Sequence, residues 1–131
     1  MTDLVSTGFN EKLGLTLTAR GPERVAATVD LTPEHHQPFG IVHGGVYCAV
    51  IETLASIGGA EYWTGPGRTV VGVNNNTDFL RAVSEGTLEA EALPIHRGRT
   101  QQLWAVTLTG ADGKLVARGQ VRLANLERPT A

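Results

Sequence analysis

The sequence predicts an α+β domain in which an antiparallel sheet of five to six strands wraps around one long central helix. Most of the chain alternates apolar and polar residues with a period of two, which is typical of half-buried strands. Residues 44–60 instead repeat apolar side chains at helical spacing. The chain has 131 residues, 41% of them hydrophobic and 18% charged, so we expect a single domain over residues 1–131.

Turns that carry Gly or Pro divide the alternating segments. In the second expected strand Val25, Ala27 and Val29 share one face, and in the fourth Glu89 and Glu91 point outward. A brief helical turn is expected before the first strand. We expect strands over residues 13–18, 24–31, 69–80, 87–95, 103–108 and 115–123.

The helical segment carries two rows of residues spaced three or four apart. The apolar row, which should face the sheet, consists of Val46, Val50, Leu54 and Ile57. The other row has small residues around one carboxylate and consists of Gly45, Ala49, Glu52 and Ser56. The pair Gly58-Gly59 predicts a helix end nearby.

A single apolar helix can cover only one face of a single sheet. The simplest cover for the surface that is left over is a symmetric second copy of the chain. We therefore expect at least a dimer.

Composition and charge indicate which partners and which cellular location to expect. A formal net charge of -2 gives no reason to expect nucleic acid or an anionic membrane as partner. The single cysteine, Cys48, cannot form an internal disulfide, and no signal peptide or membrane-spanning run is evident, so we expect a cytoplasmic protein. Cys48 itself is interpreted as a small apolar residue. The spacing of the histidines predicts no metal site; these are His35, His36, His43 and His96.

Glu52 is the candidate for chemistry, because it is the only Asp, Glu, Lys or Arg between His35 and Ala60. A charged side chain in so apolar a helix is costly unless it is paired or hydrogen-bonded. A lone Glu on an amphipathic helix usually lies on a solvent-facing stripe or meets an arginine. Here the rest of that polar stripe is missing, which weakens this alternative.

The start of the helix offers a second candidate, Gly44-Gly45. Glycines let the backbone approach a ligand closely, and the first N–H groups of a helix have no internal acceptor. This suits a carbonyl oxygen that becomes an oxyanion, although the pair could serve only a tight turn or close packing. Glu52 lies about two turns further along, too far to act easily on the same carbonyl, which suggests that two subunits complete one site.

The pattern Gln37…His43-Gly44-Gly45…Glu52…Ser56 resembles the hotdog-fold thioesterases of the phenylacetate-pathway branch. Within that branch it is similar to the type of 4-hydroxybenzoyl-CoA thioesterase that has a glutamate on the central helix. The similarity extends over residues 42–56, 70–81 and 96–123, where the chain looks like an actinobacterial protein of this group.

The resemblance implies a role for each residue of the pattern. The Gly44 N–H binds the thioester oxygen, and Glu52 is the nucleophile or the general base. Gln37 orients the thioester or water, and Ser56 positions water where the 4-hydroxybenzoyl enzyme has threonine. His43 is interpreted as ordering the loop or the thioester. The family builds its sites across a dimer interface, usually within a tetramer, so we expect a homodimer or a dimer of dimers.

Coenzyme A would need partners for its phosphates, and Arg97-Gly98-Arg99 is a basic turn suited to them. Related thioesterases place CoA contacts near this turn, although it could be a solvated hairpin whose arginines do nothing. Arg81 is a weaker candidate. Asn74, Asn75 and Asn76 alternate across an expected strand, so at least one should face inward and line the acyl or pantetheine pocket, or bond only to backbone. Of the three, Asn75 is named as the binding candidate. No separate cofactor is expected, since CoA is part of the substrate.

These observations predict an acyl-CoA, or aroyl-CoA, thioester hydrolase. One alternative is a hotdog hydroxyacyl-thioester dehydratase, which pairs a histidine with a helix acid; His36 and His43 leave it open. A second alternative is a non-catalytic acyl-CoA binding protein.

Overall fold

The computed structural model describes residues 4–129 and confirms an α+β fold with one long helix and six strands. A short helix precedes the first strand, as expected. The elements in chain order are α1 (Gly8–Leu13), β1 (Leu15–Ala19), β2 (Val25–Asp30), the 3-10 turn η1 (Pro33–His35), α2 (Gly44–Tyr62), β3 (Arg68–Phe79), β4 (Thr87–Arg97), β5 (Gln101–Thr109) and β6 (Leu115–Glu127).

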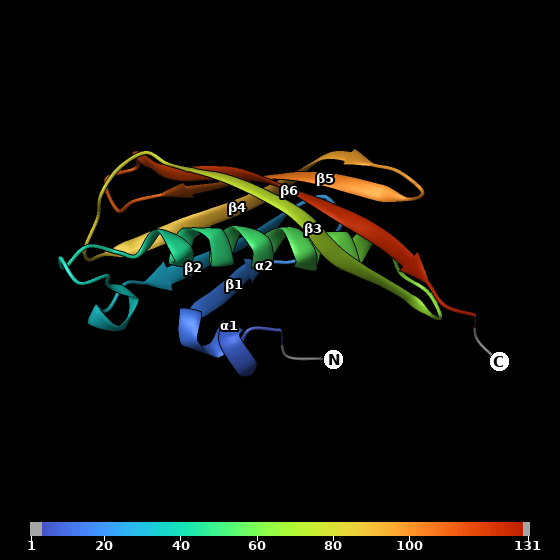
Figure 1. Ribbon diagram of the computed structural model, residues 1–131, viewed down its shortest axis with the longest axis horizontal. Helices are drawn as coiled ribbons and strands as arrows, with labels where there is room; N and C mark the ends of the chain where they lie inside the picture. The colour runs from blue at the N-terminus through green and yellow to red at the C-terminus, as the bar shows by residue number, and fades with distance from the viewer. Residues whose placement is uncertain (1–3, 130–131) are drawn as a thin grey trace.

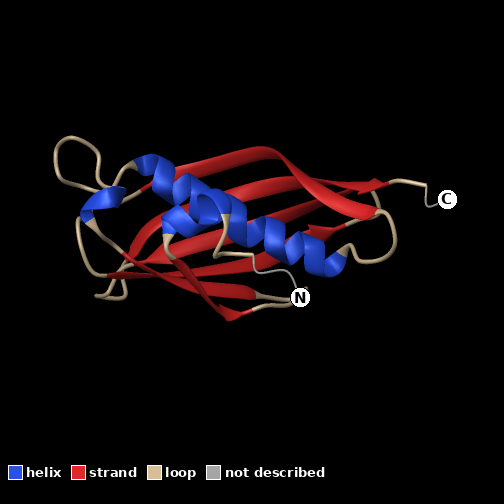
Figure 2. Cartoon of the chain, turned by 90° about the horizontal axis from the view of Figure 1, so that it is seen from below, coloured by secondary structure: helices blue, strands red, loops and turns tan. Residues whose placement is uncertain are grey.

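The six strands form one antiparallel sheet in the order β1-β2-β4-β5-β6-β3. The sheet curves over α2, and α1 lies on the side of α2 away from the sheet (Figures 1 and 2). β1 and β3 form the two edges. α2 therefore has one face on the sheet and another that the chain covers only in part.

The core consists of the apolar rows that the sequence predicts. Val50 and Leu54 on α2 are fully buried, as are Trp104, Val106 and Leu108 on β5. These side chains lose their contact with water together, which is the main favourable term in folding. The row of α2 that contains Glu52 is less buried, so its side chains remain available at the border of the sheet.

The helix end predicted near Gly58-Gly59 is confirmed, because α2 ends three residues later, at Tyr62, but the two glycines do not themselves terminate it. A Cβ on Gly58 would lie 2.5 Å from the indole of Trp104, and a Cβ on Gly59 would lie 2.2 Å from Leu123 Cδ1. Both glycines are needed because the helix approaches the sheet closely there. Neither has the positive φ of a helix-terminating glycine.

β3 is an exposed edge, unlike the four central strands. Its apolar residues Val71, Val73 and Phe79 are 45%, 57% and 55% exposed. A bulge between Gly72 and Asn74 interrupts its pairing with β6. A long, apolar strand edge has unpaired backbone groups that can bind another strand.

The segment before β1 is held against α2. The Thr53 hydroxyl donates to Asn10 Oδ1 at 3.1 Å and to the Ala49 carbonyl at 2.7 Å, and Asn10 Nδ2 donates to the Leu4 carbonyl at 2.8 Å. These bonds place Leu4 and Asn10 beside the helix row that contains Glu52. Over residues 4–129, no helix has both the length and the apolar character that a bilayer crossing requires.

Candidate active site

The Glu52 carboxylate projects from the middle of α2 toward the edge strand β3. The side chain is half-buried, and Oε1 accepts a hydrogen bond from Asn75 Nδ2 at 3.1 Å. A Cβ on Gly72 would lie only 2.0 Å from Oε2. The absence of a side chain at Gly72 therefore makes the space that the carboxylate occupies.

Asn75 connects the carboxylate to the strand. Its Nδ2 also donates to the Cys48 carbonyl at 3.1 Å, and its Oδ1 accepts from the Thr77 hydroxyl at 2.7 Å. Asn75 pairs with the buried Val121, so it faces α2, while Asn74 and Asn76 face the other side of the sheet. The structure thus brings Asn75 to Glu52 rather than to the basic turn.

Glu52 and Ser56 open into one cavity of about 530 Å³ between α2, the start of β3 and the N-terminal segment. Ser56 lies one helical turn after Glu52, and over residues 4–129 its hydroxyl has no hydrogen-bond partner. Most of the surface exposed in the cavity is apolar, although half of the other lining residues are polar. These residues are Leu4, Ile57, Ala60 and Val70, which are apolar, and Asn10, Thr53, Arg68 and Thr69, which are polar. A carboxylate and a free hydroxyl therefore lie beside a space suited to an apolar group.

His43 caps the start of α2. Its Nδ1 accepts a hydrogen bond from the Gly45 N–H at 2.8 Å, which orders the loop as expected. A Cβ on Gly45 would lie 2.8 Å from His43 Nδ1, so the second glycine allows the cap to form. Within residues 4–129, no acceptor bonds the Gly44 N–H, which is left free at the tip of the helix.

Gln37, Gly44 and Phe79 line a second cavity of about 290 Å³, together with residues from the end of β3 and the loop after it. Gln37 Oε1 accepts a hydrogen bond from the Phe39 N–H, which leaves both Nε2 hydrogens unbonded within the described chain. A Cβ on Gly44 would lie 2.5 Å from the Phe79 ring, so the ring rests on the first glycine. This cavity offers two free N–H donors and no carboxylate.

The two cavities share no lining residue. The first includes Arg68, Thr69 and Val70 from the start of β3, and the second includes Phe79 from its end. Along α2, the Cα atoms of Gly44 and Glu52 are about 12 Å apart. Within one chain the carboxylate lies beside the middle of β3, in a cavity that reaches the start of the strand, whereas the free N–H donors lie at its end.

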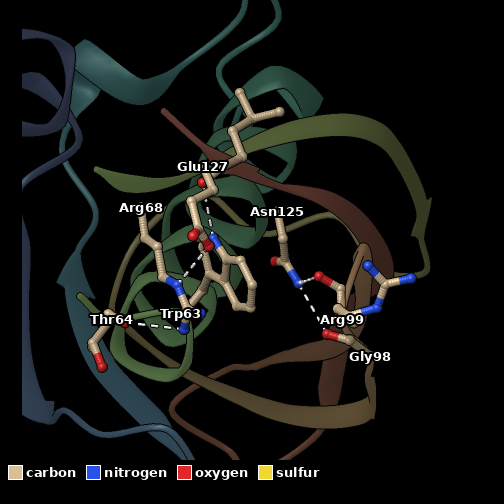
Figure 3. A network of polar contacts seen from close by, with 8 residues as sticks. Trp63, Thr64, Arg68, Gly98, Arg99, Asn125 and Glu127 are labelled. Atoms are coloured by element: carbon tan, nitrogen blue, oxygen red, sulfur yellow. Dashed lines mark hydrogen bonds and ion pairs between the residues drawn. The ribbon is translucent and has the colours of Figure 1, made fainter. Parts of the chain in front are cut away.

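The turn between β4 and β5 is held rigidly and leaves one arginine free. Asn125 Nδ2 donates to the carbonyls of Gly98 at 2.9 Å and Arg99 at 3.2 Å (Figure 3). Arg97 Nη1 donates to Glu23 at 2.8 Å, and its guanidinium lies over the Tyr62 ring at 5.0 Å. Arg99 is exposed, and its side chain has no partner in residues 4–129. Arg99 is thus the better placed of the two for a phosphate.

Arg81 lines the second cavity but is already paired. Its Nη2 lies 3.1 Å from Asp112 Oδ2, and its Nη1 lies 3.3 Å from Oδ1. The Lys114 N–H and then Arg81 hold the pKa of the Asp112 carboxyl below its usual value. A phosphate would have to compete with Asp112 for this guanidinium.

The histidines near the helix start have structural partners. His35 accepts from the Thr32 N–H at its Nδ1, and its Nε2 lies 3.0 Å from the Leu13 carbonyl. His36 Nε2 lies 2.7 Å from the Ser84 carbonyl. No group of three or more His, Cys, Asp or Glu within residues 4–129 is placed to hold a metal ion. No histidine lines the Glu52 cavity.

Two contacts that shape this site could not be predicted from the sequence. The contact between Gly72 and Glu52 and the cover of Phe79 over Gly44 both depend on strand register, which a pattern of alternation does not define. One signal in the sequence could have pointed to these contacts: glycines that lie outside the turns, at positions 44, 45 and 72. Glycine inside a helix or strand often marks a close approach of another group.

A model of the family described as the thioesterase superfamily matches residues 39–117. The chain belongs to the thioesterase superfamily. This thioesterase is 51% identical over 125 residues to the protein Rv1847 of Mycobacterium tuberculosis, a match that covers 94% of this chain and 89% of that protein. It is 34% identical over 116 residues to the proofreading thioesterase EntH of Cronobacter sakazakii, covering 88% and 84%.

Solved structures of related proteins have the same fold. AziG of S. sahachiroi superposes with a TM-score of 0.88 at 47% identity, covering 93% of this thioesterase and 98% of that chain. Thioesterase HI1161 of Haemophilus influenzae gives a TM-score of 0.87 at 34% identity, covering 95% and 86%. The fold is therefore the hotdog fold, and the family and its relatives make the protein a thioester hydrolase.

Proposed function

We propose that the protein hydrolyses acyl-CoA thioesters in active sites shared between two copies of the chain. The single observation that carries the proposal is the separation of the two half-sites along β3. The cavity that holds the carboxylate and the Ser56 hydroxyl reaches one end of this strand, and the cavity with the free N–H donors of Gly44 and Gln37 lies at the other end. Neither half is a complete site for thioester hydrolysis.

Pairing of two β3 edges would join the halves. In an antiparallel pair related by a two-fold axis, the start of one strand lies beside the end of the other. Glu52 and Ser56 of one copy would then face Gln37 and Gly44 of the partner. The exposed Val71 and Val73 would be covered in the same step, which supports this edge as the interface. The assembly is a homodimer or a dimer of dimers.

In each shared site the thioester oxygen accepts hydrogen bonds from the Gly44 N–H and from Gln37 Nε2. These donors stabilise the negative charge that develops when the carbonyl carbon is attacked. Glu52 either attacks that carbon itself or removes a proton from an attacking water held by Ser56. If Glu52 attacks, the C–S bond breaks to leave an acyl–Glu52 anhydride, which a water molecule then hydrolyses to the free acid and the free carboxylate. If water attacks, the C–S bond breaks to give the free acid directly, and the proton that Glu52 removed from water passes to the departing sulfur. In both routes CoA leaves as the thiol, with water as the source of its proton.

The two cavities suggest how the substrate lies. The larger, mostly apolar cavity beside Glu52 suits an aliphatic or aromatic acyl group. Arg99 on the rigid β4–β5 turn is free to pair with a CoA phosphate. A cytoplasmic setting fits this substrate and the single thiol of Cys48.

The dehydratase alternative gains no support from the chain. That chemistry needs a histidine beside the helix acid, and the Glu52 cavity has none. His36 is bonded to the Ser84 carbonyl, and His43 uses Nδ1 to cap α2. The unbonded N–H groups at the helix tip favour stabilisation of an oxyanion instead.

The test is thiol release from a panel of short, long and aromatic CoA esters by the wild type, Glu52→Ala and Glu52→Gln. Loss of the general base or nucleophile should lower kcat at least about a hundredfold, with an unchanged melting temperature. Glu61→Gln is the matched control, since Glu61 lies on the same helix but pairs with Arg20. This variant should keep wild-type activity.

Two results would contradict the proposal. Unchanged hydrolysis by Glu52→Ala would remove the carboxylate from the mechanism. Binding of CoA esters by calorimetry, with no thiol released by the wild type, would favour the non-catalytic binding protein.

A further inference from the structure

Tyr47 carries a buried polar group that the proposed mechanism does not use. It lies three residues after Gly44 on the first turn of α2 and is 3% exposed. Its ring packs against Phe79 with the ring centres 5.8 Å apart and the planes tilted by 57°. Both rings lie beside the helix tip that presents the free Gly44 N–H.

The Tyr47 hydroxyl is the one buried side-chain polar atom in residues 4–129 that has no hydrogen-bond partner. A buried hydroxyl without a partner destabilises the folded state, so native proteins rarely keep one. Burial also raises the pKa of Tyr47, so the group stays protonated and can donate. A phenylalanine would fill the same space without this cost.

The helix geometry directs the phenol toward the second cavity. Side chains on an α-helix lean toward its N-terminus, so Tyr47 covers the turn that contains Gly44. Tyr47 lines the cavity of about 290 Å³ together with Gly44 and Gln37. Ile41 and Leu80 give the cavity apolar walls, and its one guanidinium is already paired with Asp112.

We propose that the Tyr47 hydroxyl is a binding group for the pantetheine arm of the substrate, donating to the arm's amide carbonyl nearest the thioester. The inference rests on the proposed function, because the Gly44 N–H fixes the thioester oxygen at one end of this cavity. An arm of methylene groups and amides matches apolar walls with few polar groups. The acyl group occupies the larger cavity of the other copy, beside that copy's Glu52.

Phe79 covers this position in the free protein. Its ring contacts both Gly44 and Tyr47 and, at 55% exposure in the single chain, is not part of that chain's core. Entry of the arm displaces the ring and brings an acceptor to the hydroxyl. The free protein thus carries a cost that substrate binding removes.

The test is Tyr47→Phe, with Tyr62→Phe as the matched control. Tyr62 lies at the far end of the same helix, where its exposed hydroxyl donates to the Arg97 carbonyl at 3.3 Å. KM and kcat are measured for an acyl-CoA and for the S-ethyl thioester of the same acid, which has no amide. Melting temperatures are measured without substrate.

Tyr47→Phe should raise KM for the acyl-CoA about five- to tenfold, the effect of one lost hydrogen bond, with little change in kcat. KM for the S-ethyl thioester should not change, and the melting temperature should stay level or rise. Tyr62→Phe should leave both KM values unchanged.

Three results would overturn the inference. A lower melting temperature of Tyr47→Phe would show that the hydroxyl has a structural partner in the assembled protein. An equal rise in KM, or an equal fall in kcat, for the acyl-CoA and the S-ethyl thioester would place the Tyr47 hydroxyl at the reacting carbonyl. Wild-type KM and kcat of Tyr47→Phe for both thioesters would show that the hydroxyl has no role in substrate binding. Absence of thiol release by the wild type would instead refute the proposed function, and binding of a non-hydrolysable CoA thioether would then still test Tyr47.

Discussion

Replacing Gly72 by alanine separates the position of the carboxylate from the stability of the fold. A Cβ at this position would lie 2.0 Å from Glu52 Oε2, whereas an ordinary contact is 3.4 Å or more. The carboxylate must therefore move by at least about 1.4 Å, which breaks or lengthens its bond to Asn75. Misplacing a reacting group by about 1 Å costs roughly a hundredfold in rate, so we expect kcat to fall by about that factor.

The free energy of unfolding of Gly72→Ala should rise, although its kcat falls. Gly72 lies on an exposed edge strand and lacks a positive φ, so alanine fits the backbone. Removing glycine from a strand raises the free energy of unfolding by about 0.5–1 kcal/mol. The three nearest atoms belong to the end of a flexible side chain that faces a cavity.

The assay pairs thiol release with thermal unfolding. Gly21→Ala is the control, because its nearest neighbour would be the Arg24 carbonyl oxygen at 4.0 Å. It should leave kcat unchanged. Full activity in Gly72→Ala, or a loss of activity matched by a loss of stability, would refute the reasoning.

Three further predictions concern other residues, two of them with a matched control variant. Asn75→Ala should lower kcat about tenfold, because the hydrogen bond to the Glu52 carboxylate is lost. Asn74→Ala, on the other face of β3, should leave kcat unchanged, and equal effects of the two variants would contradict the role of Asn75. Arg99→Ala should raise KM for CoA esters but not for S-ethyl esters at an unchanged melting temperature, whereas Arg97→Ala should lower the melting temperature because Arg97 binds Glu23. Gly58→Ala should lower the free energy of unfolding by about 1–3 kcal/mol in denaturant titrations, since its Cβ would meet the buried indole ring of β5; an unchanged midpoint would show that the helix can shift.

The sequence was sufficient for the architecture, because periodicity is a local property. Alternation located each strand to within a few residues, and the row from Val50 to Leu54 identified the buried face of α2. The pair Gly58-Gly59 predicted a helix end nearby, and α2 does end at Tyr62, but the glycines are there for close packing. A glycine that ends a helix and a glycine that admits a neighbouring indole look the same in the sequence. Only the register of β5 and β6 under α2 distinguishes them.

The candidate site was predictable where it depends on one element. Spacing along α2 was enough to separate Gly44 from Glu52 and to suggest a shared site. The neighbours that shape the site come from β3, and the bulge between Gly72 and Asn74 shifts which side chains face the helix. No local pattern reports a bulge, so the contact of Asn75 with Glu52 could be narrowed to the Asn run but not assigned.

Mixing two inactive variants tests the shared site most directly. Glu52→Ala lacks the carboxylate and Gln37→Ala lacks a donor, so each alone should be nearly inactive. When the two are unfolded together and refolded in equal amounts, half of the dimers are mixed and each mixed dimer regains one of its two sites, which predicts about a quarter of wild-type thiol release. Activity no higher than that of the separate variants would contradict sites built from two chains.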